Sequence, residues 1–277
     1  MKHENPINMN RITHIALLLL LPITACNIDD ALYNTPHPDK GAVTVTTGCP
    51  DMHRLMINET TVTVRGETNV FPALLNEATY TLAAFNMPEG MTATGGVVSV
   101  NTLSDGTLTP QPGELRSNVM QIDVAKDDTL RVSLPLQQRT RRLTLKMTTE
   151  GGDASIIAST DAALTGIAPA INVSTNRLTG APATVKPFFT LADGVLTAEV
   201  NLIGVFPDEK QMFTITITAT DGQQQILKQD LSEVFATFNQ STEPLTLGAK
   251  LELMLDASFG FNITDWTEGR SGTADAN

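Results

Sequence analysis

Apolar and polar residues alternate with a period of two along most of this chain. Residues 60–65 (TTVTVR), 78–85 (ATYTLAAF) and 211–219 (QMFTITITA) are clear examples, rich in Val, Thr and Ile. This alternation is typical of half-buried β-strands. It predicts a first series of strands at residues 41–47, 60–65, 78–85, 97–100, 119–124 and 129–134. A second series is predicted at residues 142–149, 155–160, 162–167, 185–191, 195–203, 211–219, 224–228, 245–255 and 259–266.

One stretch has helical spacing instead. Residues 230–233 (DLSE) match a capping box, with an N-cap carboxylate and a Glu three residues later. Leu231, Val234, Phe235 and Phe238 then follow at the spacing of one helix face. We expect a short helix that crosses between two strands. A catalytic helix is the alternative, but the stretch carries no histidine, so we interpret it as packing.

The strand pattern predicts the domain organisation. Many short strands separated by Gly and Pro turns are typical of β-sandwiches, and a body of about 250 residues suits two domains. We place the joint in the basic stretch at residues 136–142 (LQQRTRR), expected as an exposed linker, with a processing site for an Arg-directed protease as the alternative. The predicted units are an N-terminal sandwich at 41–138, a C-terminal sandwich at 139–267 and a flexible tail at 268–277.

The N-terminus has the order of an export signal. A basic start with Lys2 and Arg11 leads into an apolar run at residues 15–21 (IALLLLL), and Ile-Thr-Ala-Cys ends at Cys26. The apolar run is much shorter than the roughly 20 residues of a transmembrane helix. We therefore predict a signal peptide at residues 1–25, cleaved between Ala25 and Cys26, with a diacylglyceryl group on the Cys26 thiol.

Two alternatives stay open at this end. An ordinary signal peptide followed by an unmodified cysteine is one, and a true start at Met9 is the other. Under the lipoprotein interpretation, residues 26–40, with Pro36 and Pro38, form a tether, and the acyl chains hold the protein on a membrane.

The charge narrows the range of partners. The formal net charge is -12, and loss of Lys2, Arg11 and Glu4 with the signal removes two positive charges and one negative, leaving -13. An acidic chain with no long basic run argues against nucleic acid and against adsorption to anionic lipid headgroups.

Candidate catalytic chemistry is sparse. After the signal only His37 and His53 remain, which we place in the tether and in a loop, and they leave no metal-ligand spacing and no clear Ser–His or Cys–His arrangement. We predict no enzyme, no metal and no cofactor, although carboxylates paired by the fold stay open. Asp105-Gly106 and Asp193-Gly194 are interpreted as turns and not as calcium loops, and Asp221-Gly222 as a hairpin turn.

Cys49 is the one cysteine not used by the lipid. It shares its strand parity with Val43 and Val45, so we predict that its thiol faces inward and is unreactive. An intermolecular disulfide is the alternative.

The order of short segments along the mature chain carries a family resemblance. The segments are ALYNTPHPDK at residues 31–40, ATYTLAAFN at 78–86, ALTGIA at 163–168, PLTLG at 244–248 and ITDW at 263–266. This succession resembles the FimB-type fimbrial subunit and anchor lipoproteins of anaerobic Gram-negative bacteria. Only Cys26 carries over as a defined functional residue, and Cys49 stands where the family tends to have a Trp near the end of the first strand.

The resemblance implies both fold and function. It implies an all-β protein of two tandem transthyretin-like, Greek-key β-sandwich domains, anchored by lipid in the outer membrane and exposed at the cell surface. It further implies an anchor, assembly or accessory subunit of a fimbrium that binds fimbrillin-like pilin subunits, which we expect to occur by strand addition. A surface glycan-binding lipoprotein is the alternative, and a cluster of exposed aromatic side chains would favour it. A lipoprotein hydrolase is a third, which converging carboxylates of raised pKa would favour.

The lipid prediction can be tested directly. Because the acyl chains are the expected membrane anchor, Cys26→Ala should release the protein from the membrane fraction and abolish its labelling by a palmitate analogue. Cell fractionation with metabolic labelling measures both. A variant that stays membrane-bound and labelled would disprove the assignment.

Overall fold

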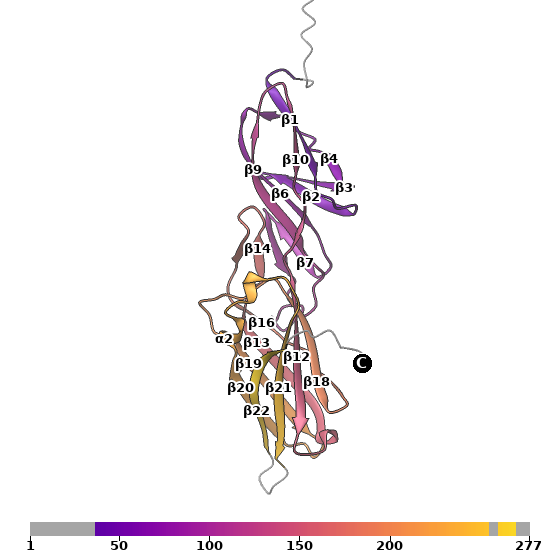
Figure 1. Cartoon of the computed structure of the whole chain (residues 1–277), viewed down its shortest axis with the longest axis vertical. Helices are drawn as coiled ribbons and strands as arrows, with labels where there is room; N and C mark the ends of the chain where they lie inside the picture. Colours follow the sequence, from indigo (N-terminus) through magenta and orange to yellow (C-terminus); the bar gives the residue numbers. More distant parts are fainter. Residues whose placement is uncertain (1–36, 255–259, 270–277) are drawn as a thin grey trace, which may run out of the picture. The chain divides into compact units, whose positions relative to one another are not determined.

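The computed structural model describes residues 37–254 and 260–269 (Figure 1). Ala25, Cys26, most of the predicted tether and residues 270–277 lie outside the described residues. The strands of the first series are β1 Lys40–Thr46, β2 Met52–Ile57, β3 Thr60–Arg65, β4 Thr68–Val70, β5 Leu75–Asn76, β6 Ala78–Asn86, β7 Met91–Thr94, β8 Val97–Val100, β9 Arg116–Val124, β10 Thr129–Ser133 and β11 Gln137–Gln138.

The second series contains the remaining strands and the short helix. Its elements are β12 Arg141–Glu150, β13 Ile157–Ile167, β14 Ala170–Asn172, β15 Arg177–Thr179, β16 Ala183–Val185, β17 Thr190–Ala192, β18 Val195–Leu202, β19 Met212–Ala219, β20 Gln224–Asp230, α2 Ser232–Phe235, β21 Leu245–Met254 and β22 Gly260–Gly269, with single 3-10 turns at Ala154–Ile156 and Phe238–Gln240.

Five sheets arise from these strands, with non-consecutive neighbours in most of them. Their orders are β10-β1-β4 with β5 also on β1, β11-β9-β6-β2-β3, β17-β18-β12-β21-β22, β16-β13-β19-β20 and β15-β14-β8-β7. In each series the first strand pairs in parallel with a late one, β1 with β10 and β12 with β21. The predicted all-β sandwich fold with one short helix is confirmed.

The first core lies between the sheet of β1 and the sheet of β6. Val43 and Val45 of β1 are fully buried against Leu82 and Ala84 of β6 and other apolar residues. The alternate residues of β6, Ala83 and Phe85, point to the opposite face of the sheet and belong to a second cluster. The sheet of β6 is therefore covered on both faces.

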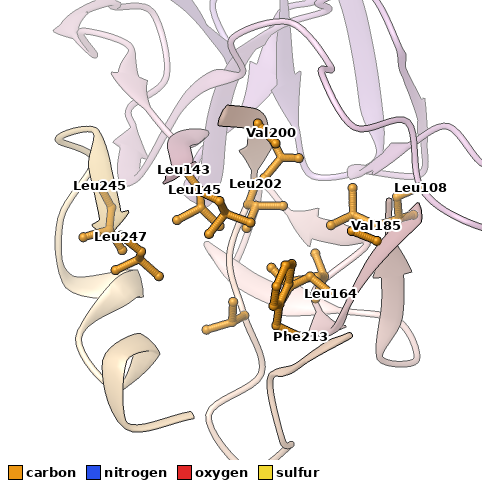
Figure 2. Packing of buried hydrophobic residues seen from close by; sticks show 14 of the residues in the cluster. Leu108, Leu143, Leu145, Leu164, Val185, Val200, Leu202, Phe213, Leu245 and Leu247 are labelled. Atoms are coloured by element: carbon orange, nitrogen blue, oxygen red, sulfur yellow. The ribbon is translucent and has the colours of Figure 1, made fainter. Parts of the chain in front are cut away.

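The second core lies between the two sheets that contain β12 and β19. Figure 2 shows Leu143, Leu145, Leu245 and Leu247 facing Leu164 and Phe213, and all six are buried. Each such side chain contributes about 1.5–3 kcal/mol relative to an exposed position, so these alternating positions dominate the stability of this part.

A small sheet joins the two strand series. Residues 97–99 of β8 pair with β14, which comes from the other side of the boundary predicted near residue 138. The division into domains 41–138 and 139–267 stays a prediction, and this sheet shows that the two series share backbone hydrogen bonds. At the far end, β22 continues to Gly269, into the predicted tail.

The basic stretch at 136–142 is not an exposed linker, so this prediction was wrong. Thr140 and Arg141 are buried, at 1% and 7% exposure. The Arg141 guanidinium donates to the carbonyl oxygens of Phe238, at 2.8 Å, and Glu243, and it lies 4.8 Å from the centre of the Phe238 ring. An arginine with these partners can be buried without leaving its donors unsatisfied, and this burial also argues against a protease site there.

His53 was predicted in a loop and lies in β2 instead. Its ring is 1% exposed, with Nε2 3.0 Å from the Thr47 hydroxyl and Nδ1 2.9 Å from the Asp51 carbonyl. The strand was missed because Leu55, Met56 and Ile57 are all buried, on the two covered faces of one sheet. A strand covered on both faces shows no alternation.

The strand predicted at 185–191 is divided in two. β16 ends at Val185 and β17 begins at Thr190, and the residues between them, which include Pro187, have no regular structure.

The short helix α2 confirms the prediction at 230–238. The segment that contains α2 connects β20 in one sheet to β21 in the other. Phe235 of α2 is buried, and its ring centroid lies 5.3 Å from that of the buried Phe238. The capping box does not form. Asp230 instead accepts from the backbone N–H of Ser232 at 3.1 Å, and Leu231 occupies the N-cap position without a side-chain bond.

Trp266 lies in the last strand, β22, and its side chain packs against the core, as predicted. Its replacement therefore tests the stability of the fold. The side chain is half-buried, and its ring meets Phe213 edge-on at 5.3 Å. We expect Trp266→Ala to lower the free energy of unfolding by about 3 kcal/mol, the lower end for a large aromatic, because the ring is only partly buried. Chemical denaturation measures this.

Trp266→Phe is the matched control. The indole Nε1 is buried and has no hydrogen-bond partner among the described residues, so Phe loses area and no hydrogen bond, and it should cost much less than Ala. Equal stability of the Ala variant and the parent would contradict the packing role.

Candidate functional site

The edges of the five sheets are where this chain can accept a strand from another protein. The last strand of a sheet leaves backbone N–H and C=O groups unpaired on its outer side. Here these edge strands are β4, β10, β11, β3, β17, β22, β16, β20, β15 and β7.

The segment at residues 105–112 covers the edge of β16 and the part of β18 that β17 does not reach. Leu108 donates its backbone N–H to the Thr184 carbonyl at 2.8 Å, and Asn201 donates its own to the Pro110 carbonyl at 2.9 Å. The Gln111 side chain reaches the Glu199 carbonyl at 3.2 Å. This side of the second pair of sheets is therefore occupied by the chain itself.

An ion pair fixes the start of that segment. Lys186 Nζ lies 2.9 Å from an Asp105 carboxylate oxygen. The pKa of Asp105 is held well below its usual range, first by hydrogen bonds from the Thr107 hydroxyl and backbone N–H and then by Lys186. Both charged groups are well exposed to solvent, so the pair orients the loop more than it stabilises the fold. The turn predicted at Asp105-Gly106 is confirmed.

Three longer edges are not covered in this way in the part of the chain that the structure describes. In β3 the exposed Thr61 and Thr63 alternate with the half-buried Val62 and Val64. β10 shows the same alternation, whereas in β20 the half-buried positions include Gln225 and Gln229 and the exposed ones include Ile226. An edge of this kind offers an added strand both backbone groups and alternate apolar contacts.

Exposed apolar side chains are few and scattered. Phe188 is 78% exposed, and Leu191 lies nearby on β17, while Met52 and Val70 belong to the first series. Phe188 is the one aromatic among the exposed large hydrophobic residues that the structure describes. The cluster of exposed aromatic side chains that would favour a glycan site is therefore not found among the described residues.

The described carboxylates show no sign of an acid–base pair. The pKa values of Asp153 and Asp230 are lowered, each first by the hydroxyl of the serine two residues on, at Ser155 and Ser232. Hydrogen bonds within a local turn or helix cap lower these two pKa values, so the pKa shifts are structural. Within residues 37–254 and 260–269 no three His, Cys, Asp or Glu residues gather as a metal site would require.

The two other predicted turns are observed. Asp193 and Gly194 have positive φ angles of 50° and 73° in the β17–β18 hairpin, and Asp221-Gly222 makes the β19–β20 hairpin.

Cys49 does not face the core, so this prediction was wrong. β1 ends at Thr46, and Cys49 lies in the loop that follows, half-buried, with its Sγ 3.9 Å from the Asp51 carbonyl. It lines a surface hollow of about 330 Å³ together with Met52, Asn86 and other residues. The parity argument fails because alternation holds only while the backbone stays extended.

Sequence comparison identifies one family. The model for the fimbrillin-A associated anchor proteins Mfa1 and Mfa2 matches residues 52–269. No curated protein is detectably similar to the chain in sequence.

Several solved structures share the fold. The fimbrial anchor protein Mfa2 from Porphyromonas gingivalis superposes with a TM-score of 0.63 at 10% identity, over 83% of this chain and 97% of that one. A candidate adhesin from Bacteroides ovatus gives 0.59 at 12% identity, over 83% and 96%. A candidate polysaccharide-binding protein from Bacteroides thetaiotaomicron gives 0.55 at 10% identity, over 82% and 96%.

Within the described residues, no helix is both long and apolar enough to span a bilayer.

The position of Cys49 makes its reactivity testable. In the folded Cys26→Ala protein we expect a small maleimide to label Cys49 without denaturant, because the thiol borders an open hollow. Mass spectrometry after timed labelling measures this, with denatured protein as the reference. Labelling that requires denaturant would restore the inward-facing assignment.

Proposed function

We propose that this chain, which belongs to the family of fimbrillin-associated anchor proteins, attaches or assembles a surface fimbrium as a lipoprotein of the outer membrane. Cys26 carries the lipid after cleavage at Ala25, and residues 26–40 hold the body away from the bilayer. The sandwiches then bind the fimbrial subunits. The match of the family model over residues 52–269 is the observation that carries the proposal.

Strand addition is the proposed mode of binding. The edges of β3 and β10 suit it, because each alternates exposed polar residues with half-buried apolar ones, such as Leu130 and Val132 of β10. Backbone hydrogen bonds would supply affinity, and the apolar positions would supply register. Such binding should depend little on salt, since neither contribution is screened as surface charges are.

The proposed role is structural and not enzymatic. It is supported by the lowered pKa values of Asp153 and Asp230 and by His53, whose two ring nitrogens lie within hydrogen-bond distance of the Thr47 hydroxyl and the Asp51 carbonyl. A general base needs a ring or carboxylate free to reach a substrate.

Deletion of the gene tests the function. We expect mutant cells to shed their fimbriae or to carry fibres of altered length, because the fibre loses its attachment to the lipid anchor. Electron microscopy and immunoblotting of the medium measure this. Complementation with the parent chain should restore attachment, while the Cys26→Ala chain should leave the fibres in the medium.

Two outcomes would contradict the proposal. Normal, attached fimbriae in the mutant would remove the anchor role. Loss of polysaccharide binding together with normal fimbriae would instead support the glycan-binding alternative.

A further inference from the structure

Three sulfur-bearing side chains line one surface hollow of the first strand series. The hollow of about 330 Å³ beside Cys49 is also bounded by Met52 and Met87. Met52 is 59% exposed, although a large apolar side chain is most often found in a core. Met87 is half-buried and packs with one side on the core. One thiol and two thioethers therefore border the same space, which we call the sulfur hollow.

The pairing of β2 with β6 brings the two methionines together. His53 lies opposite Asn86 in this antiparallel pair, so the register carried one residue further places Met52 opposite Met87. Side chains directly opposite one another lie on the same face, with their Cβ atoms about 5 Å apart. Methionine is unbranched and has three rotatable bonds, so both sulfur atoms can approach one point above this face.

Hydrogen bonds hold the Cys49 loop beside the methionines. The Thr47 hydroxyl accepts from the Cys49 backbone N–H at 3.3 Å and lies 3.0 Å from His53 Nε2. Nδ1 of the same ring lies 2.9 Å from the Asp51 carbonyl, to which the Cys49 thiol donates at 3.9 Å. His53 and Thr47 are buried, at 1% and 3% exposure. This buried network fixes the backbone that carries the thiol, and a preorganised ligand requires such support.

The donor atoms are those that a soft metal ion prefers. Thiolate and thioether sulfurs select Cu(I), whereas Mg²⁺ and Ca²⁺ take oxygen ligands. One thiolate also balances the charge of a monovalent cation, so the loaded site is neutral. A structural Zn²⁺ site needs four Cys, His or carboxylate ligands. The Glu114 carboxylate, which also lines the hollow, lies 3.2 Å from the Arg116 guanidinium, so the sulfur atoms are the donors that best fit a metal ion.

We propose that Cys49, Met52 and Met87 bind one Cu(I) ion in the sulfur hollow, each through its sulfur atom. On binding, the S–H bond of Cys49 breaks, its proton passes to solvent, and the thiolate forms a bond to the ion. The methionines each donate a thioether lone pair, and neither sulfur nor copper changes oxidation state. This site goes beyond fimbrial attachment and does not depend on it.

The test is a titration of the Cys26→Ala chain, in which Cys49 is the only cysteine, with Cu(I) against a chromophoric Cu(I) chelator without oxygen. We expect one ion per chain and loss of this site in Cys49→Ala. Met52→Leu and Met87→Leu keep the apolar volume and remove one sulfur each. Loss of an outer-shell partner costs about 10- to 100-fold in metal affinity, so loss of a direct ligand should weaken binding by at least about ten-fold. Met56→Leu is the matched control, because Met56 lies on the same strand but is buried outside the hollow.

Two further measurements identify the ligands. X-ray absorption should find three sulfur neighbours around the bound copper and one fewer in each Met→Leu variant. Bound Cu(I) should also protect Cys49 from maleimide, and Zn²⁺ at the same concentration should protect it much less. Equal Cu(I) affinity in the parent and in the Met52→Leu/Met87→Leu double variant would overturn the proposal and leave Cys49 as an isolated thiol. Tighter binding of Zn²⁺ than of Cu(I), or no Cu(I) bound by the parent, would also overturn it.

Discussion

The backbone groups at the edges of its sheets are the constraint on which the rest of this structure depends. Each edge needs hydrogen-bond partners, since an unpaired buried N–H or C=O costs free energy comparable to a lost bond. Residues 105–112 supply partners along β16 and β18, and glutamine amides supply them along β22. The edges of β3, β10 and β20 stay available at the ends of their sheets. The balance of covered and open edges determines where another chain can bind.

Parallel pairing between strands that are far apart in the sequence determines which strands lie inside the sheets and which lie at these edges. β1 lies between β10 and β4, and β12 lies between β18 and β21. Because the first strand of each series occupies the interior of a sheet, its side chains are buried in the core and its backbone is paired on both sides. The buried Arg141 begins β12 and binds the carbonyls after α2, so the same strand also holds the helical crossover in place.

Most strands could be predicted from the sequence, and the errors have identifiable causes. The segments at 60–65, 195–203 and 211–219 were placed within one residue, because one face of each is more buried than the other. β2 was missed because its sheet is covered on both faces. Cys49 was assigned inward because the parity of β1 was extended past Thr46. The joint at residues 136–142 was expected in solvent, since arginines are rarely buried without partners, and the partners come from residues about 100 positions away.

The sequence by itself determined most of the longer strands, the dipeptides that make the hairpin turns and, through the order of its segments, the family. These properties depend on neighbours within a few residues, and a period of two records them directly. Only the tertiary structure decided which edges are closed. In the sequence, Gln225 and Gln229 are ordinary polar positions of an alternating strand. Their hydrogen bonds to the backbone of β22 form only because the fold places that strand, from a different sheet, beside them. Pairing between sheets depends on groups far apart in the chain, and no local pattern carries that information.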